Sequence, residues 1–232
     1  MNCDDLDEEI YPGRLSVDSE AGLSNQVTKI LPYEDSPPLY CCYDRALLVA
    51  HKEGAPGKYV GAHESVRAAA YSVPPVFSTL YGSVAGVDDT DVSLAINNEL
   101  RLVAYRGHGS SSAWTAWNLV NDNYNGTDVI GLANIGSQSP VVWSLACTNN
   151  DLNAADSIGE VWMKDPNNRA VSFYGAAVPS YTADGRNRRL VECMDVSAAR
   201  RRADEDPPPT IRSTSRSTFR LLISRATDQD AI

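Results

Sequence analysis

The stretch "LRLVAYRGHGS" (residues 100–110) joins a continuous apolar run to a loop in which a histidine stands between two glycines. Apolar residues that follow one another without alternation are typical of a strand buried on both faces of a parallel sheet. Three further runs have this character: "ALLVA" (46–50), "PVVWSLA" (140–146) and "AVSFYGAA" (170–177). The sequence therefore predicts a parallel sheet, with the loop of His108 at the carboxyl end of one strand.

Helical patterns lie between these runs. In "ESVRAAAYSV" (64–73) an i, i+3, i+4, i+7 spacing predicts one apolar face, made of Val66, Ala69, Ala70 and Val73. "DDTDVSLAINN" (88–98) and "GTDVIGLAN" (126–134) each place Thr-Asp before an apolar turn, which is typical of an N-cap with an acid near the helix start. "DSIGEVWMK" (156–164) is a fourth candidate helix. Strands that alternate with helices predict an α/β sandwich with right-handed crossovers.

A histidine and a cysteine follow two of the predicted strands. In such folds the loops at the carboxyl ends of the strands form the active site. "GHGS" follows one strand and "CTNND" (147–151) follows the next, so we expect His108 and Cys147 on the same edge of the sheet. A thiolate is the nucleophilic form of cysteine, and an imidazole transfers protons near neutral pH. The glycines would let the Gly109 amide approach a substrate carbonyl, so the pair predicts cysteine–histidine hydrolysis.

Two plainer interpretations stay open from the residues alone. His108 could be an ordinary loop histidine, and Cys147 a small buried apolar side chain at a strand end. Ser110 or Ser111 could also be a nucleophile. However, "GHGSS" is not the GxSxG pattern and lacks the strand–elbow–helix setting of a serine hydrolase.

Composition excludes several classes of protein. The 232 residues carry a formal net charge of −10, and residues 1–184 hold 23 acidic against 10 basic side chains. Such a surface is unsuited to neutralising the phosphates of DNA or RNA. No run approaches the roughly 18 apolar residues of a membrane span, and no secretory signal is visible at the N-terminus. The five cysteines are irregularly spaced without CxxC, so we expect no metal site, cofactor or disulfide framework.

"YRGHGSSSAW" (105–114) followed by "VVWSLACTNND" (141–151) resembles the catalytic core of the gingipain-type cysteine peptidases, which are more distant relatives of caspases, legumain and clostripain. The matching positions are Gly107, His108, Gly109, Ser110, Trp114, Ala146, Cys147, Asn149 and Asp151. "RALLVAHKEG" (45–54), "HESV" (63–66) and the segment 156–181 resemble further family motifs in the same order. The resemblance spans residues 11–181.

The resemblance implies a caspase-like three-layer α/β/α sandwich with a mostly parallel sheet, and an endopeptidase acting on polypeptides. Cys147 would attack the scissile carbonyl, His108 would protonate the leaving amine, and Glu53 would orient His108. The amides of Gly109 and Cys147 would hold the oxyanion. Without the family, Glu53 would be read as a solvated loop carboxylate. Relatives are typically secreted and some bind structural calcium, so both properties are implied by the resemblance only.

The resemblance also assigns a substrate pocket to Val60, Trp114 and Tyr181. Arg- or Lys-directed family members carry an acid three residues before the histidine of "HESV", and here that position holds Val60. An apolar floor predicts an uncharged residue before the scissile bond. The alternative is that Glu64 supplies the missing carboxylate.

Three regions are predicted along the chain. Residues 1–43 resemble the last part of the family's N-terminal subdomain, and residues 44–184 its catalytic subdomain. Residues 185–232 form an Arg/Ser/Pro-rich tail that we expect to be disordered. A chain shorter than its family at both ends leaves one alternative function, that of a catalytically inactive homologue acting as a binding module.

Overall fold

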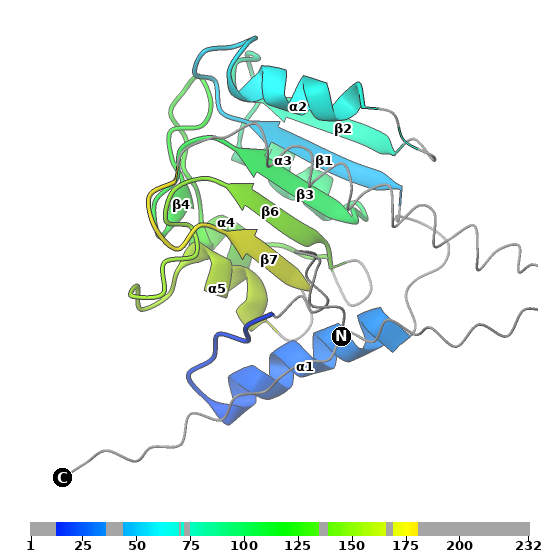
Figure 1. Cartoon of the computed structure of the whole chain (residues 1–232), viewed down its shortest axis with the longest axis vertical. Helices are drawn as coiled ribbons and strands as arrows, with labels where there is room; N and C mark the ends of the chain where they lie inside the picture. The colour runs from blue at the N-terminus through cyan, green and yellow to red at the C-terminus, as the bar shows by residue number, and fades with distance from the viewer. Residues whose placement is uncertain are drawn as a thin grey trace, which may run out of the picture.

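The computed structural model describes residues 13–35, 44–69, 71, 75–134, 139–165 and 169–180. Within these ranges a five-stranded parallel sheet has the order β2-β1-β3-β6-β7 (Figure 1). Its strands are β1 (Arg45–Ala50), β2 (Val76–Tyr81), β3 (Leu102–Arg106), β6 (Val141–Leu145) and β7 (Ser172–Gly175). A short antiparallel pair is formed by β4 (Ala113–Trp114) and β5 (Tyr124–Asn125). The helices are α1 (Glu20–Asp35), α2 (Tyr59–Arg67), α3 (Asp89–Ile96), α4 (Gly126–Ile130) and α5 (Ile158–Lys164).

Helices cover both faces of the sheet, which confirms the predicted α/β sandwich. On one face, side chains of β1, β3 and β6 join α3, α4 and α5 in the largest apolar cluster, which includes Val103, Ile96 and Trp162. On the other face, Val66 of α2 packs against Leu48 and Ala104. The central strands β1 and β3 are buried almost throughout, as their continuous apolar runs predicted.

The two edge strands differ from the sequence-based expectation. The run around β7 was predicted to be buried on both faces, but Ser172 and Tyr174 are exposed along it. That prediction was wrong because β7 is the last strand of the described sheet and one of its faces is open. β2 was missed altogether, since Ser78 and Thr79 interrupt its apolar pattern.

Helix boundaries also needed correction. α2 begins at Tyr59 and ends at Arg67, so of the predicted apolar face only Val66 lies in the helix, beside the buried residues Tyr59, Val60 and His63. The predicted Thr-Asp pairs are not N-caps. The caps are Asp88 and Asn125, each two residues before the threonine of its pair. Their side chains accept hydrogen bonds from the N–H groups of Thr90 and Thr127. The following aspartates complete both capping boxes.

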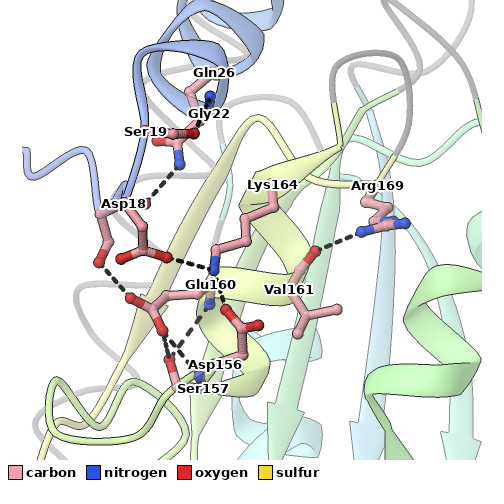
Figure 2. Close-up of polar contacts among 11 residues, drawn as sticks. Asp18, Ser19, Gly22, Gln26, Asp156, Ser157, Glu160, Val161, Lys164 and Arg169 are labelled. Atoms are coloured by element: carbon pink, nitrogen blue, oxygen red, sulfur yellow. Dashed lines mark hydrogen bonds and ion pairs between the residues drawn. The ribbon is translucent and has the colours of Figure 1, made fainter.

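The segment before the sheet packs on α5, at the β7 end of the sheet (Figures 1 and 2). Figure 2 shows Lys164 between Asp18 and Asp156. The Glu160 carboxylate accepts a hydrogen bond of 2.5 Å from the Ser16 hydroxyl. The buried Lys29 ammonium donates to the Met163 carbonyl at 2.9 Å. Residues 185–232, the predicted disordered tail, lie outside the described residues. No described helix is long and apolar enough to cross a membrane.

Candidate active site

Three loops meet at the carboxyl edge of the sheet. Glu53 follows β1, His108 follows β3 and Cys147 follows β6. β3 pairs with β1 on one side and with β6 on the other, both in parallel. The prediction that the histidine and cysteine loops come from neighbouring strands is therefore confirmed, and Glu53 joins them from the third strand.

Glu53 and His108 are in side-chain contact. The Glu53 carboxylate contacts His108 Nε2 with one oxygen, and with the other it binds the Lys58 ammonium at 2.6 Å. The hydrogen bonds from Lys58 and His108 lower the pKa of Glu53 to about 2, so this carboxylate is charged at neutral pH. Because Nε2 faces Glu53, Nδ1 is the ring nitrogen of His108 that remains for other partners.

Two further rings surround His108. The His51 and His108 rings meet edge to face with centroids 4.8 Å apart, and the Tyr59 hydroxyl lies 3.4 Å from His108 Nε2. His51 is buried, and its Nδ1 accepts a hydrogen bond of 2.9 Å from the Glu53 N–H. Burial, together with the nearby His108, lowers the pKa of His51 to about 4. A neutral imidazole therefore supports the Glu53 backbone on one side and the His108 ring on the other.

The glycines around His108 are required by close packing. A Cβ on Gly107 would lie 2.4 Å from His51 Cβ and 2.4 Å from the Tyr105 hydroxyl. A Cβ on Gly109 would lie 2.8 Å from Ala146 Cβ and 3.0 Å from the Cys147 carbonyl oxygen. Gly107 thus lets the histidine loop pack on His51 and Tyr105, and Gly109 lets it pack on the cysteine loop; a side chain at either position would clash.

Asn149 ties the two loops together. Its side chain is fully buried, and its Nδ2 donates to the carbonyls of Ser110 at 2.6 Å and Ala113 at 3.1 Å. Its Oδ1 accepts a hydrogen bond of 2.5 Å from Ser144 on β6. Asn149 was noted in the sequence only as part of a motif, because its partners lie 36 to 39 residues away in the chain.

Cys147 lies at a sharp turn. The residue after it, Thr148, has a φ of 51°. This left-handed conformation is strained for a β-branched side chain and is held by the surrounding packing. The Cys147 thiol is partly exposed and donates to the Ser180 carbonyl at 3.3 Å. Neither the Gly109 N–H nor the Cys147 N–H donates a hydrogen bond to another described residue.

The residues expected to form the substrate pocket have different surroundings. Trp114 is fully buried, stacked on Tyr105 with its Nε1 donating to Ser144, so assigning it to a substrate pocket was wrong: it belongs to the core. Val60 is 6% exposed and packs in an apolar cluster with Ala50. Tyr181 lies outside the described residues.

The structure also shows the surroundings of Glu64, the alternative pocket carboxylate, and of Ser110, an alternative nucleophile. Glu64 already accepts hydrogen bonds from Tyr81 at 2.6 Å and from Arg67 at 2.9 Å, so its carboxylate is engaged on α2. The Ser110 hydroxyl contacts Ser112, and no described histidine contacts it. Among the described residues, neither Ser110 nor Ser111 has a histidine as a hydrogen-bond partner, so the geometry does not favour the serine alternative.

Three side chains at this edge could hold a metal ion. The ligand atoms of His51, Glu53 and His108 all lie within 4.8 Å of one another. His51 was not predicted as a site residue, because its place beside His108 arises only in the folded chain.

A parallel sheet with helices on both faces, and with a histidine loop and a cysteine loop side by side at its carboxyl edge, is the architecture of caspase-like α/β proteins. The chain belongs to peptidase family C25, whose family model matches residues 2–211. Membership of a gingipain-type cysteine peptidase family, expected from the sequence motifs, is thus confirmed.

The chain is similar to gingipain R2 and gingipain R1 of Porphyromonas gingivalis. It is 29% identical to each over 148 residues, which cover 62% of this chain but 19% and 14% of those proteins. Among solved structures, the crystal structure of the Arg-specific cysteine proteinase gingipain R matches with a TM-score of 0.63 and 21% identity. That match covers 84% of this chain and 50% of the gingipain chain, and it shows the shared fold.

Proposed function

We propose that this chain is a cysteine endopeptidase that hydrolyses peptide bonds with Cys147 as nucleophile and His108 as acid and base. One observation carries the proposal: the Glu53–His108 pair and the Cys147 loop meet at one sheet edge, with Gly109 packed against Cys147. Membership of a cysteine peptidase family supports the same chemistry.

In the acylation step His108 Nδ1 takes the proton of the Cys147 thiol, and the thiolate attacks the carbonyl carbon of the scissile bond and forms a C–S bond. The negative charge moves to the carbonyl oxygen, where the free N–H groups of Gly109 and Cys147 can donate to it. When the intermediate collapses, the C–N bond breaks and His108 Nδ1 gives its proton to the leaving amine. Before this step the thiol must leave the Ser180 carbonyl to which it donates.

In the deacylation step a water molecule attacks the thioester carbonyl and gives a proton to His108 Nδ1. The C–S bond then breaks, which releases the carboxylic acid product and restores the thiol–imidazole pair. Glu53 holds Nε2–H throughout, which leaves Nδ1 for the proton transfers of the reaction. Charge on Glu53 also stabilises the imidazolium, as the carboxylate of a catalytic triad does.

For specificity we propose an uncharged residue before the scissile bond. The similar gingipain R is an Arg-specific proteinase, whereas by the resemblance of the "HESV" motif Val60 holds the position of the family's pocket acid here. Glu64, four residues after Val60 on α2, is already engaged by Tyr81 and Arg67. A buried cation without its partner loses roughly 2–5 kcal/mol of binding energy.

The rival proposal is a binding module without activity. It rests on the small share of the curated relatives that this chain spans. Fluorogenic peptides that differ only at the residue before the scissile bond separate the alternatives. An active chain should cleave apolar members and lose turnover in Cys147→Ala. Binding of the same peptides without any cleavage would support the module, and cleavage of Arg peptides that depends on Glu64 would overturn the specificity.

A further inference from the structure

The chain has three histidines, and two of them stand ring to ring beside a carboxylate at the sheet edge. The third, His63, is buried on α2 with its Nε2–H donating to the Val49 carbonyl. We propose that His51, Glu53 and His108 together bind a divalent transition-metal ion, and that the bound ion blocks hydrolysis by removing His108 from proton transfer. Only the inhibition rests on the proposed function; the binding does not.

The donor set suits zinc. Two imidazoles and one carboxylate are ligands that Zn²⁺ uses with a fourth position left open. The three ligand atoms lie within 4.8 Å of one another. On a tetrahedral ion with bonds of about 2.0–2.1 Å, ligand atoms are about 3.3 Å apart. The Glu53 and His108 side chains are 46% and 51% exposed, so small rotations of these two can close the site around the fixed His51.

The hydrogen bonds of the free site identify the atoms that would change partners. His51 Nδ1 accepts from the Glu53 N–H, so it is the unprotonated ring nitrogen and the one that a metal takes. The Glu53 amide then turns to water, which is accessible because Glu53 is exposed. Lys58 occupies one carboxylate oxygen of Glu53 at 2.6 Å and opposes the metal by charge.

Binding is tested with ZnCl₂ as the probe on the untagged full chain carrying Cys147→Ala, so that no thiolate of the catalytic pair can hold the ion. Isothermal titration calorimetry should show one Zn²⁺ per chain. His51→Phe keeps a ring against His108 and removes both nitrogens. Removing a residue that only hydrogen-bonds to a metal ligand typically weakens metal affinity about 10–100-fold. His51 would be a ligand itself, so His51→Phe should weaken Zn²⁺ binding by at least that much. Lys58→Met should tighten it.

Glu53→Gln serves as the second variant, because it preserves side-chain shape if His51→Phe does not fold. Co²⁺ added to the unmodified chain should give the absorption bands of a cobalt ion bound by nitrogen and oxygen ligands. It should give no thiolate-to-cobalt charge-transfer band. If Zn²⁺ affinity disappears in Cys147→Ala, the ion belongs to the Cys–His pair and the proposal is overturned. Unchanged affinity in both His51→Phe and Glu53→Gln would also overturn it, by placing the ion elsewhere. Micromolar ZnCl₂ should inhibit peptide cleavage reversibly. If the chain is no peptidase, only this inhibition measurement fails, and the binding measurements still test the metal site.

Discussion

Asn149 is the residue on which the geometry of the site depends most. Its amide bridges the carbonyls of Ser110 and Ala113 to the hydroxyl of Ser144, and it is fully buried. Asn149→Ala leaves the Ser110 carbonyl without its donor and removes one of two partners from the Ala113 carbonyl and from the Ser144 hydroxyl, which keep the Ser110 N–H and Trp114 Nε1. Each buried group that loses a partner costs about 1–3 kcal/mol. We expect urea unfolding to show a loss of about 2–5 kcal/mol, together with reduced peptide turnover.

The matched control is Asn153→Ala, an exposed asparagine in the same loop whose side chain bonds to no described residue. It should change stability by less than about 0.5 kcal/mol. Equal stability of the Asn149→Ala and Asn153→Ala chains would contradict the bridging role.

Glu53 is predicted to position His108 rather than to exchange protons itself. His108→Ala should lower kcat by about 10²–10⁴-fold, the usual contribution of a proton-transfer group. Glu53→Gln can still accept the hydrogen bond from Nε2, so it should cost less and change the pH profile of kcat, because only the charge is lost. Glu64→Gln, which alters an ion-paired carboxylate of α2, is the control and should leave that profile in place. Identical pH profiles for Glu53→Gln and the unaltered chain would remove Glu53 from the site.

At the scale of elements, α5 depends on its cap. Ser157 accepts a hydrogen bond from the Glu160 N–H and the Glu160 carboxylate accepts one from the Ser157 N–H, which completes a capping box. The same carboxylate accepts a hydrogen bond from the Ser16 hydroxyl, so the cap also anchors the segment before the sheet. Ser157→Ala should lower the free energy of unfolding by about 0.5–2 kcal/mol, measured in urea. Ser157→Asp keeps a capping acceptor and should retain most of the unfolding free energy that Ser157→Ala loses. An equal loss in both variants would contradict the capping role.

The elements show which features of the fold a sequence can predict. β1, β3 and β6 carry continuous apolar runs because helices cover both of their faces, and their carboxyl ends therefore placed His108 and Cys147 correctly. β2 and β7 lie at the edges, where burial and hence the apolar signal is incomplete. His51 and Asn149 could not be assigned roles in advance, because these depend on partners brought together only by folding.

At the scale of the whole molecule, two buried histidines make the fold sensitive to acid. Burial lowers the pKa of both His51 and His63 to about 4, whereas an unfolded histidine titrates near 6.5. Between these values the unfolded chain binds more protons than the folded one. Their contribution to stability is therefore fully present above pH 6.5 and is lost as the pH falls toward 4.

Urea unfolding between pH 4.5 and 7.5 should therefore show stability falling with acid. The slope is at most about 1.4 kcal/mol per pH unit for each histidine. His63→Gln can still donate to the Val49 carbonyl but does not titrate. It should therefore reduce the slope of unfolding free energy against pH by the contribution of up to one proton. Parallel curves for the two chains would show that His63 does not take up a proton on unfolding.

We propose that Cys147 is a nucleophile and that His108 activates it. Covalent labelling of the cysteine tests this most directly. The full chain is incubated with a peptidyl acyloxymethyl ketone that carries an apolar residue next to the reactive group, and peptide mapping by mass spectrometry locates the adduct. We predict one thioether adduct, on Cys147, which is absent in Cys147→Ala and forms far more slowly in His108→Ala. An unlabelled Cys147, or labelling spread over Cys41 and Cys42 at rates that His108→Ala does not change, would contradict the account.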